Sequence, residues 1–113
     1  MKSSSEIFNT IFEDVITPTM DEIMSEDYKE ALAGESALCQ DEAEFVKFRG
    51  AFEQRIKLFY FRQFTKYKKE GQEKIFPGSI EKVQEDTHFL YVEFKSFLKE
   101  QRLKINKGEA SKI

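Results

Sequence analysis

Residues 41–70 constrain the fold more than any other segment, because thirty consecutive residues without proline carry apolar side chains at helical spacing. The main apolar stripe consists of Phe45, Phe48, Phe52, Ile56 and Phe59. Acidic residues begin the segment and lysines end it before Gly71, as the helix dipole favours. A helix of this length extends over about 45 Å. A chain of 113 residues that contains such a helix must fold around it.

A second long helix is predicted over residues 79–106. Phe76, Pro77 and Gly78 indicate a turn, and Ser79 is placed to cap the helix that follows. Its apolar stripe is Ile80, Val83, Thr87, Leu90, Phe94 and Phe97. We expect the two long helices to form an antiparallel hairpin. Residues 107–113 are predicted to be a frayed tail.

Two shorter helices are predicted before residue 34. The first, over residues 5–16, is strongly amphipathic, and Ser3 and Glu6 have the spacing of a capping box at its start. Thr17 and Pro18 then break or kink the chain, with Thr17 able to cap a second helix over residues 18–33. Laid end to end, these helices would form a third rod.

The sequence therefore predicts an all-α fold. Residues 1–113 form a single domain, a small helical bundle of two long antiparallel helices plus two shorter N-terminal helices, and no strand-like alternation competes with them. Helices this long in a small chain could also pair with a second copy. A homodimeric four-helix bundle is the alternative architecture.

Composition indicates a folded protein, since 40% of the residues are hydrophobic. No segment approaches the run of about 20 apolar residues that a membrane span requires, so we expect no membrane partner. Cys39 is the one cysteine, which excludes an intrachain disulfide and suits a reducing compartment. The N-terminal residues do not resemble a signal peptide. We therefore expect a cytoplasmic location.

The modest net charge of −3 hides an uneven distribution along the chain. Residues 1–44 contain two bases and twelve acids, a net −10, whereas residues 45–75 contain nine bases and three acids, a net +6. Such a division can steer a charged partner, or it can be neutralised where one helix packs against another.

The helix over residues 41–70 has a second face that mixes aromatic rings, cations and a glycine. Its members are Val46, Gly50, Lys57, Phe61, Phe64 and Lys68. One interpretation makes this helix the central rod, packed against the second long helix on one side and the acidic N-terminal helices on the other. The other interpretation makes this face a binding site, in which something approaches Gly50 closely. Cations and aromatic rings suit a partner protein or unpaired nucleic-acid bases.

Two charged rows are further candidates for partner binding. The basic row is Arg55, Arg62, Lys66 and Lys69, and the acidic row includes Asp21, Glu22, Glu26 and Asp27. We predict a non-catalytic protein–protein interaction module, such as a small inhibitor, immunity-type, viral accessory or adaptor protein. The alternative is a nucleic-acid-binding or transcription-regulating protein that uses the basic aromatic face.

Signals for catalysis are sparse. Glu85 and His88 have the Glu-x-x-His spacing found in di-iron bundles, but His88 is the one histidine and both residues lie away from the apolar stripe. Cys39 has no recognisable catalytic partner, and the sequence has no glycine-rich phosphate loop. We predict no catalytic, cofactor-binding or metal-binding residues, and that the protein is not an enzyme.

Overall fold

The computed structural model describes residues 3–104, with side chains for residues 3–101. The elements in chain order are α1 (Ser4–Ile11), the π-helical turn η1 (Phe12–Ile16), α2 (Thr17–Leu32), α3 (Glu42–Lys69), the short 3-10 helix η2 (Glu73–Ile75) and α4 (Ile80–Lys104). The predicted all-α fold is confirmed. The predicted tail over residues 107–113 lies outside the described residues.

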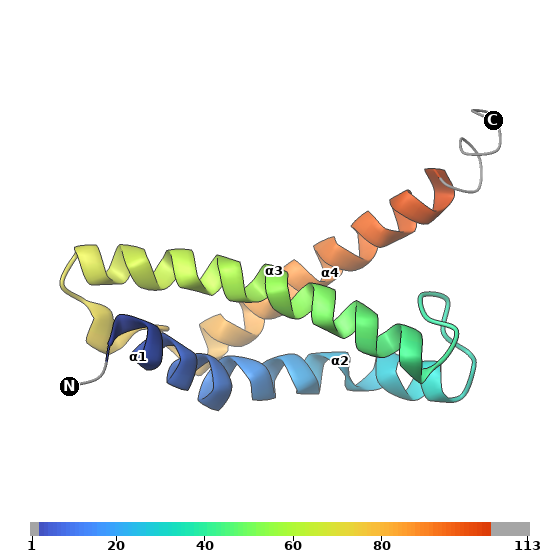
Figure 1. Cartoon of the computed structure of the whole chain (residues 1–113), viewed down its shortest axis with the longest axis horizontal. Helices are drawn as coiled ribbons and strands as arrows, with labels where there is room; N and C mark the ends of the chain where they lie inside the picture. Colours follow the sequence, from blue (N-terminus) through green and yellow to red (C-terminus); the bar gives the residue numbers. More distant parts are fainter. Residues whose placement is uncertain (1–2, 105–113) are drawn as a thin grey trace.

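Of the break or kink expected at Pro18, the break is wrong, because α1, η1 and α2 form one continuous helical rod that departs from regular α-helix in η1 (Figure 1). Thr17 has helical backbone angles and caps nothing, and its N–H bonds back to the carbonyl of Phe12. A proline ring clashes with the carbonyl four residues earlier, and a wider π-helical turn relieves that clash without ending the helix. We call residues 4–32 the N-terminal rod.

Short polar residues and glycines set the helix ends. Ser3 accepts a hydrogen bond from the Glu6 N–H at 3.2 Å, and Asp41 accepts one from the Glu44 N–H at 2.9 Å. Gly71 has a positive φ of 72°, and the Gln72 N–H reaches back to the carbonyl of Tyr67. This arrangement satisfies carbonyls that the end of α3 would otherwise leave unpaired.

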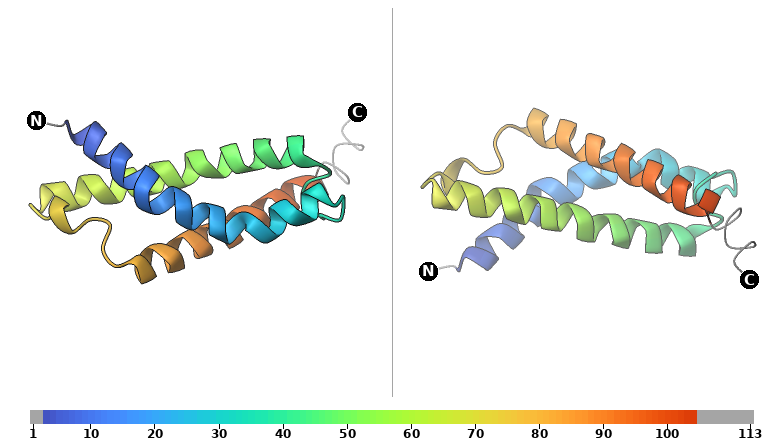
Figure 2. Two further views of the ribbon diagram at one scale, coloured as in Figure 1. Left: turned by 90° about the horizontal axis from the view of Figure 1, so that it is seen from below. Right: turned by 90° about the horizontal axis from the view of Figure 1, so that it is seen from above.

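The three long elements pack as an up-down-up bundle (Figures 1 and 2). The N-terminal rod and α3 are antiparallel along their whole lengths, from the contact of Ser4 with Lys68 to that of Tyr28 with Glu42. The rod and α4 are parallel, and α3 and α4 are antiparallel, with the Tyr60 hydroxyl bonded to the Val83 carbonyl at 3.2 Å. Among the described elements, α3 is therefore in contact with both of the others.

The buried stripe of α3 changes direction along the helix. Its members recur every four residues after the first step: Phe45, Phe48, Phe52, Ile56, Tyr60 and Phe64. A step of four residues advances about 40° beyond one full turn, so the stripe winds around the helix. At the N-terminal end it faces α4 through Phe48 and Phe52, and at the C-terminal end Phe64 faces α1.

A loop residue completes the core at the end of the bundle that α4 does not reach. Phe76 is buried against Phe8, Tyr60, Phe64 and Tyr67, with ring centroids 5.3–6.4 Å apart. It takes the place that a third helix occupies elsewhere in the bundle.

The predicted stripe of α4 is partly borne out. Val83, Thr87 and Phe94 are buried, whereas Ile80 and Phe97 are exposed, and Tyr91, absent from the predicted stripe, is buried. Among the described residues, no helix is both long and apolar enough to cross a membrane.

Candidate interaction surface

The aromatic residues predicted on the second face of α3 have different surroundings. Phe64 is only 2% exposed, and its ring lies 5.7 Å from that of Phe8 and 5.3 Å from that of Phe76. Phe61 is 45% exposed and meets the Phe8 ring edge-on at 5.3 Å. Phe64 therefore belongs to the core, while much of Phe61 remains accessible.

The lysines of this face lie at the edge of the contact with the N-terminal rod. The Lys57 ammonium lies 5.7 Å from the centre of the Phe12 ring, and the Lys68 ammonium contacts the Ser4 hydroxyl. Both lysines are exposed. Their stems cover part of the rod while their charges face solvent.

Three residues of the predicted basic row, Arg55, Arg62 and Lys66, lie on a different side of α3 from Lys57 and Lys68. The Arg55 guanidinium lies 5.3 Å from the centre of the Phe94 ring and 4.7 Å from that of Phe97, so Arg55 faces α4. Arg62 and Lys66 follow it by seven and eleven residues, on the same side of the helix and also exposed. The predicted basic candidates are therefore divided between two sides of α3.

The predicted acidic row is also divided. Asp21 forms an ion pair with Arg49 of α3, and Glu26 lies 3.6 Å from Lys29 within α2. Glu22 lines a groove between α2 and α4, together with His88. Each acid thus has its own surroundings, and the four do not face a partner together.

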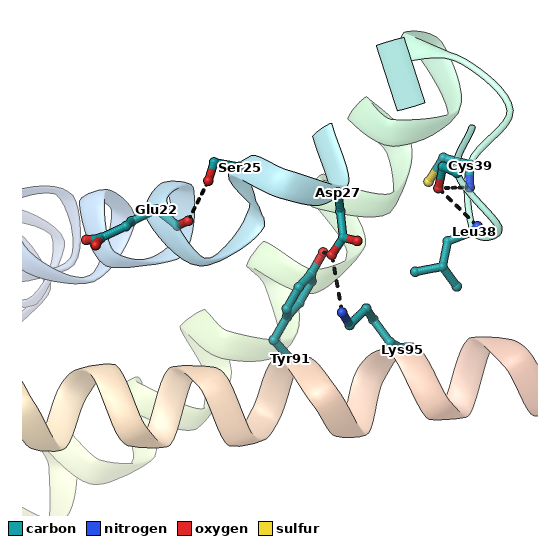
Figure 3. A network of polar contacts seen from close by, with 8 residues as sticks. Glu22, Ser25, Asp27, Leu38, Cys39, Tyr91 and Lys95 are labelled. Carbon is teal, nitrogen blue, oxygen red and sulfur yellow. Dashed lines mark hydrogen bonds and ion pairs between the residues drawn. The ribbon is translucent and has the colours of Figure 1, made fainter. Parts of the chain in front are cut away.

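Asp27 has the most buried surroundings of these acids (Figure 3). The Tyr91 hydroxyl donates a hydrogen bond to Asp27 Oδ2 at 2.5 Å, and Lys95 Nζ lies 3.3 Å from the same oxygen. Burial raises the pKa of Tyr91, and the hydrogen bond to Asp27 and the charge of Asp27 raise it further. This network ties α2 to α4.

Glu85 and His88 lie in the groove of about 450 Å³ between α2 and α4, which Thr19, Ile23 and Gln84 also line. Residues 3–101 contain no group of three or more histidine, cysteine or acidic side chains arranged to hold a metal ion. Cys39 is buried beside the start of α3.

One side of α3 remains exposed between the N-terminal rod and α4, and we call it the outer face of α3; Lys57, Phe61 and Lys68 lie at its border with the rod. Its residues, all exposed, are Ala43, Val46, Lys47, Gly50, Ala51, Gln54, Lys57, Leu58, Phe61, Thr65, Lys68 and Lys69. Val46 is 60% exposed and Leu58 is 52% exposed. The acids of α3 lie elsewhere: Glu42 accepts a hydrogen bond from Tyr28, Glu44 from the Gln40 N–H, and Glu53 is half-buried. The face is apolar and basic, with no carboxylate.

The sequence predicts six residues of this face but not the face itself. Val46, Gly50, Lys57, Phe61 and Lys68 belong to the predicted second face, and Lys69 belongs to the predicted basic row. The exposed positions of this face contain no acidic residue, which could also have indicated the face. This pattern is recognised only when the course of the buried stripe around α3 is known. A Cβ at Gly50 would meet no described atom within 4 Å, so no described part of this chain makes the predicted close approach, which stays a prediction about a partner.

Compared with protein-family models, with curated proteins and with solved structures, the chain has no match in any of the three. Its function therefore has to be inferred from the shape and charge of its own surface.

Proposed function

We propose that the chain is a non-catalytic module that binds another protein through the outer face of α3. The supporting observation is the exposure of Val46, Leu58 and Phe61 on one uncovered side of a 28-residue helix. Apolar side chains gathered on one exposed face are typical of sites where proteins meet. A small inhibitor, immunity-type, viral accessory or adaptor protein would use such a face, and the proposal involves no cofactor.

The other exposed apolar residues favour this choice. Phe89 and Val92 of α4 are 64% and 45% exposed, but they are interspersed with charges of both signs, including Glu85, Glu93 and Lys99. Mixed charges at this density are typical of a solvated helix face. The outer face of α3 instead has small and apolar residues along its middle and a single sign of charge.

Nucleic-acid binding is a second candidate, favoured by one observation. Residues 54–69 contain six cations and no acid. The six are Arg55, Lys57, Arg62, Lys66, Lys68 and Lys69. Against it, stacking on bases requires open ring faces, and Tyr60 and Phe64 are buried. Of the aromatic rings in this segment, only Phe61 is exposed.

We also propose that the protein is cytoplasmic, and that it is either a monomer or a homodimer. The single cysteine suits a reducing compartment. Light scattering on a size-exclusion column at low and high salt measures self-association. The ratio of absorbance at 260 nm to that at 280 nm across the peak reports bound nucleic acid, which salt would displace.

The protein-binding proposal is tested by selecting peptides from a random displayed library against the full chain. Matched double variants then locate the binding surface: Val46→Ser with Phe61→Ser on α3, and Val92→Ser with Phe89→Ser on α4. We expect selected peptides to bind the α4 variant as tightly as wild type and the α3 variant at least tenfold more weakly, with melting curves showing that both variants fold. Enrichment of no peptide, or binding that is lost in the α4 variant instead, would contradict the proposal.

A further inference from the structure

We propose that the segment bound by the outer face of α3 is an amphipathic helix with acidic flanks, which crosses α3 at Gly50 and Ala51. This inference rests on the proposed function and specifies its partner. It follows from the charge of the face, from the saturated backbone of α3 and from the open space above Gly50.

The charge of the face favours acidic groups on the partner. Lys47, Lys57, Lys68 and Lys69 are spread along it, and none of its residues is acidic. Lys57 and Lys68 contact an aromatic ring and a hydroxyl, and neither forms an ion pair within the described part of the chain. Carboxylates on a partner would steer it to this face and select its orientation.

The same charge argues against a second copy of this face as the occupant. Two outer faces packed together would place lysines of one copy near lysines of the other, with no acid from either to balance them. Like charges brought together at an interface are strongly unfavourable. A symmetric dimer through this face is therefore not the expected assembly.

The backbone of α3 points to a helical rather than an extended partner. Its N–H and carbonyl groups are used within the helix, so a partner strand would find no free edge to pair with. Recognition must then use side chains, and ridges of one helix fit grooves of another. From Ala43 to Phe61 the face covers nineteen residues, or about 27 Å, which a helix of similar length would match.

Gly50 identifies the point of closest approach. A glycine inside a helix costs about 1 kcal/mol relative to alanine, and packing within this chain does not require it because the space at its Cβ position is empty. Ala51 keeps the surface beside Gly50 low, between the larger side chains of Val46 and Leu58, and Ala43 does so two turns earlier. A partner backbone can approach closely at such a position.

The test uses two synthetic helical peptides of about twenty residues with the same leucine seam. One peptide carries glutamate at the flanking positions and the other carries lysine, and fluorescence anisotropy measures the binding of each to the full chain. We expect the glutamate peptide to bind at least tenfold more tightly than the lysine peptide, with an affinity that falls as salt rises. Equal binding, or preference for the lysine peptide, would overturn the inference.

Two pairs of variants locate the contact. Gly50→Leu should weaken binding of the glutamate peptide at least tenfold while the chain melts no lower than wild type, and Glu93→Leu on the exposed side of α4 should leave binding unchanged. Lys47→Glu with Lys57→Glu should reverse the preference toward the lysine peptide, whereas Lys82→Glu with Lys99→Glu on α4 should not. Unchanged binding in Gly50→Leu would exclude a crossing at this glycine.

The remaining outcomes separate this inference from the proposed function. If neither synthetic peptide binds, while the library still yields peptides that depend on Val46 and Phe61, the acidic helix is wrong and the protein-binding face stands. If light scattering shows self-association that Lys47→Glu with Lys57→Glu abolishes, the occupant is a second copy and the inference is overturned. If the library yields no peptide, both fall.

Discussion

Both ends of the bundle bury aromatic rings, but one of them adds a polar network between two helices. Where α1 meets the last turns of α3, the core is built from phenylalanine rings, with Phe8 in contact with Phe12, Phe64 and Phe76. Toward the other end, Asp27 of α2 bonds to Tyr91 and Lys95 of α4 (Figure 3). We call these the aromatic end and the polar end.

The difference shows what each end can tolerate. Burial of hydrocarbon rings does not depend on protonation, so the aromatic end should respond to changes in side-chain volume rather than to pH. The polar end depends on a carboxylate, a phenol and an ammonium group that lie within hydrogen-bonding distance, so it should respond to loss of a partner and to titration.

The largest effect is expected at the aromatic end. Phe64→Ala should lower the free energy of unfolding by about 3–5 kcal/mol, because it leaves a cavity between Phe8 and Phe76. Urea unfolding followed by circular dichroism measures it. Phe61→Ala is the matched control and should cost less than half as much, since its ring is 45% exposed. Equal losses for the two variants would contradict this assignment of the core.

A smaller effect is expected at the polar end. Asp27→Ala should cost about 1–3 kcal/mol, because it leaves the Tyr91 hydroxyl and the Lys95 ammonium without their acceptor. Asp21→Ala removes the more exposed ion pair with Arg49 and should cost less than about 1 kcal/mol. The same urea titration ranks the two variants, and a larger loss for Asp21→Ala would reverse the expected order.

Alkaline pH should destabilise the polar end through Tyr91. The pKa of Tyr91 is raised in the folded chain, so its contribution to stability is complete below about pH 10, where the unfolded tyrosine titrates, and decreases as pH rises further. Urea unfolding between pH 8 and pH 11 should show a decline that is reduced in Tyr91→Phe. Burial also raises the pKa of Tyr60, so Tyr60→Phe removes a separate part of the decline. A decline unchanged in Tyr91→Phe would contradict the prediction.

The smallest effect is expected outside both ends, on the outer face of α3. Gly50→Ala should raise the free energy of unfolding by about 0.5–1 kcal/mol, because alanine favours the helix and its methyl group meets no described atom. Melting temperature is a sufficient measurement. A loss of stability would indicate that the chain itself requires a glycine at this position.

The positions of the helices could be predicted from the sequence, because their signals are local. Ser3 and Asp41 cap helices and Gly71 ends one, each through bonds to residues within a few positions. The predicted break at Pro18 failed for a physical reason: a proline excludes a regular helical turn but not a widened one. The spacing of residues in the sequence does not show whether the packing of the N-terminal rod can stabilise a π-helical turn.

The candidate surface could be predicted only in part. Phe61 and Phe64 are three residues apart, and the sequence predicts the same face of the helix for both. In the fold Phe61 is exposed and Phe64 is buried. The buried stripe of α3 winds toward α1, where Phe64 meets Phe8. The sequence shows that residues 1–44 are acidic and residues 45–75 are basic. It does not show which faces of the helices these charges occupy. Asp21 reaches Arg49 on α3, and Asp27 bonds to α4.

The sequence by itself determined that this chain is helical and where its helices lie, because propensity, capping and periodicity act over a few residues, and it showed an acidic segment followed by a basic one. Only the tertiary structure decided which side of α3 remains uncovered. That depends on how three rods of unequal length pack, with Phe76 completing the core where α4 is absent and no described helix covering the outer face. Burial is a property of neighbours distant in sequence, and periodicity along one helix does not specify them.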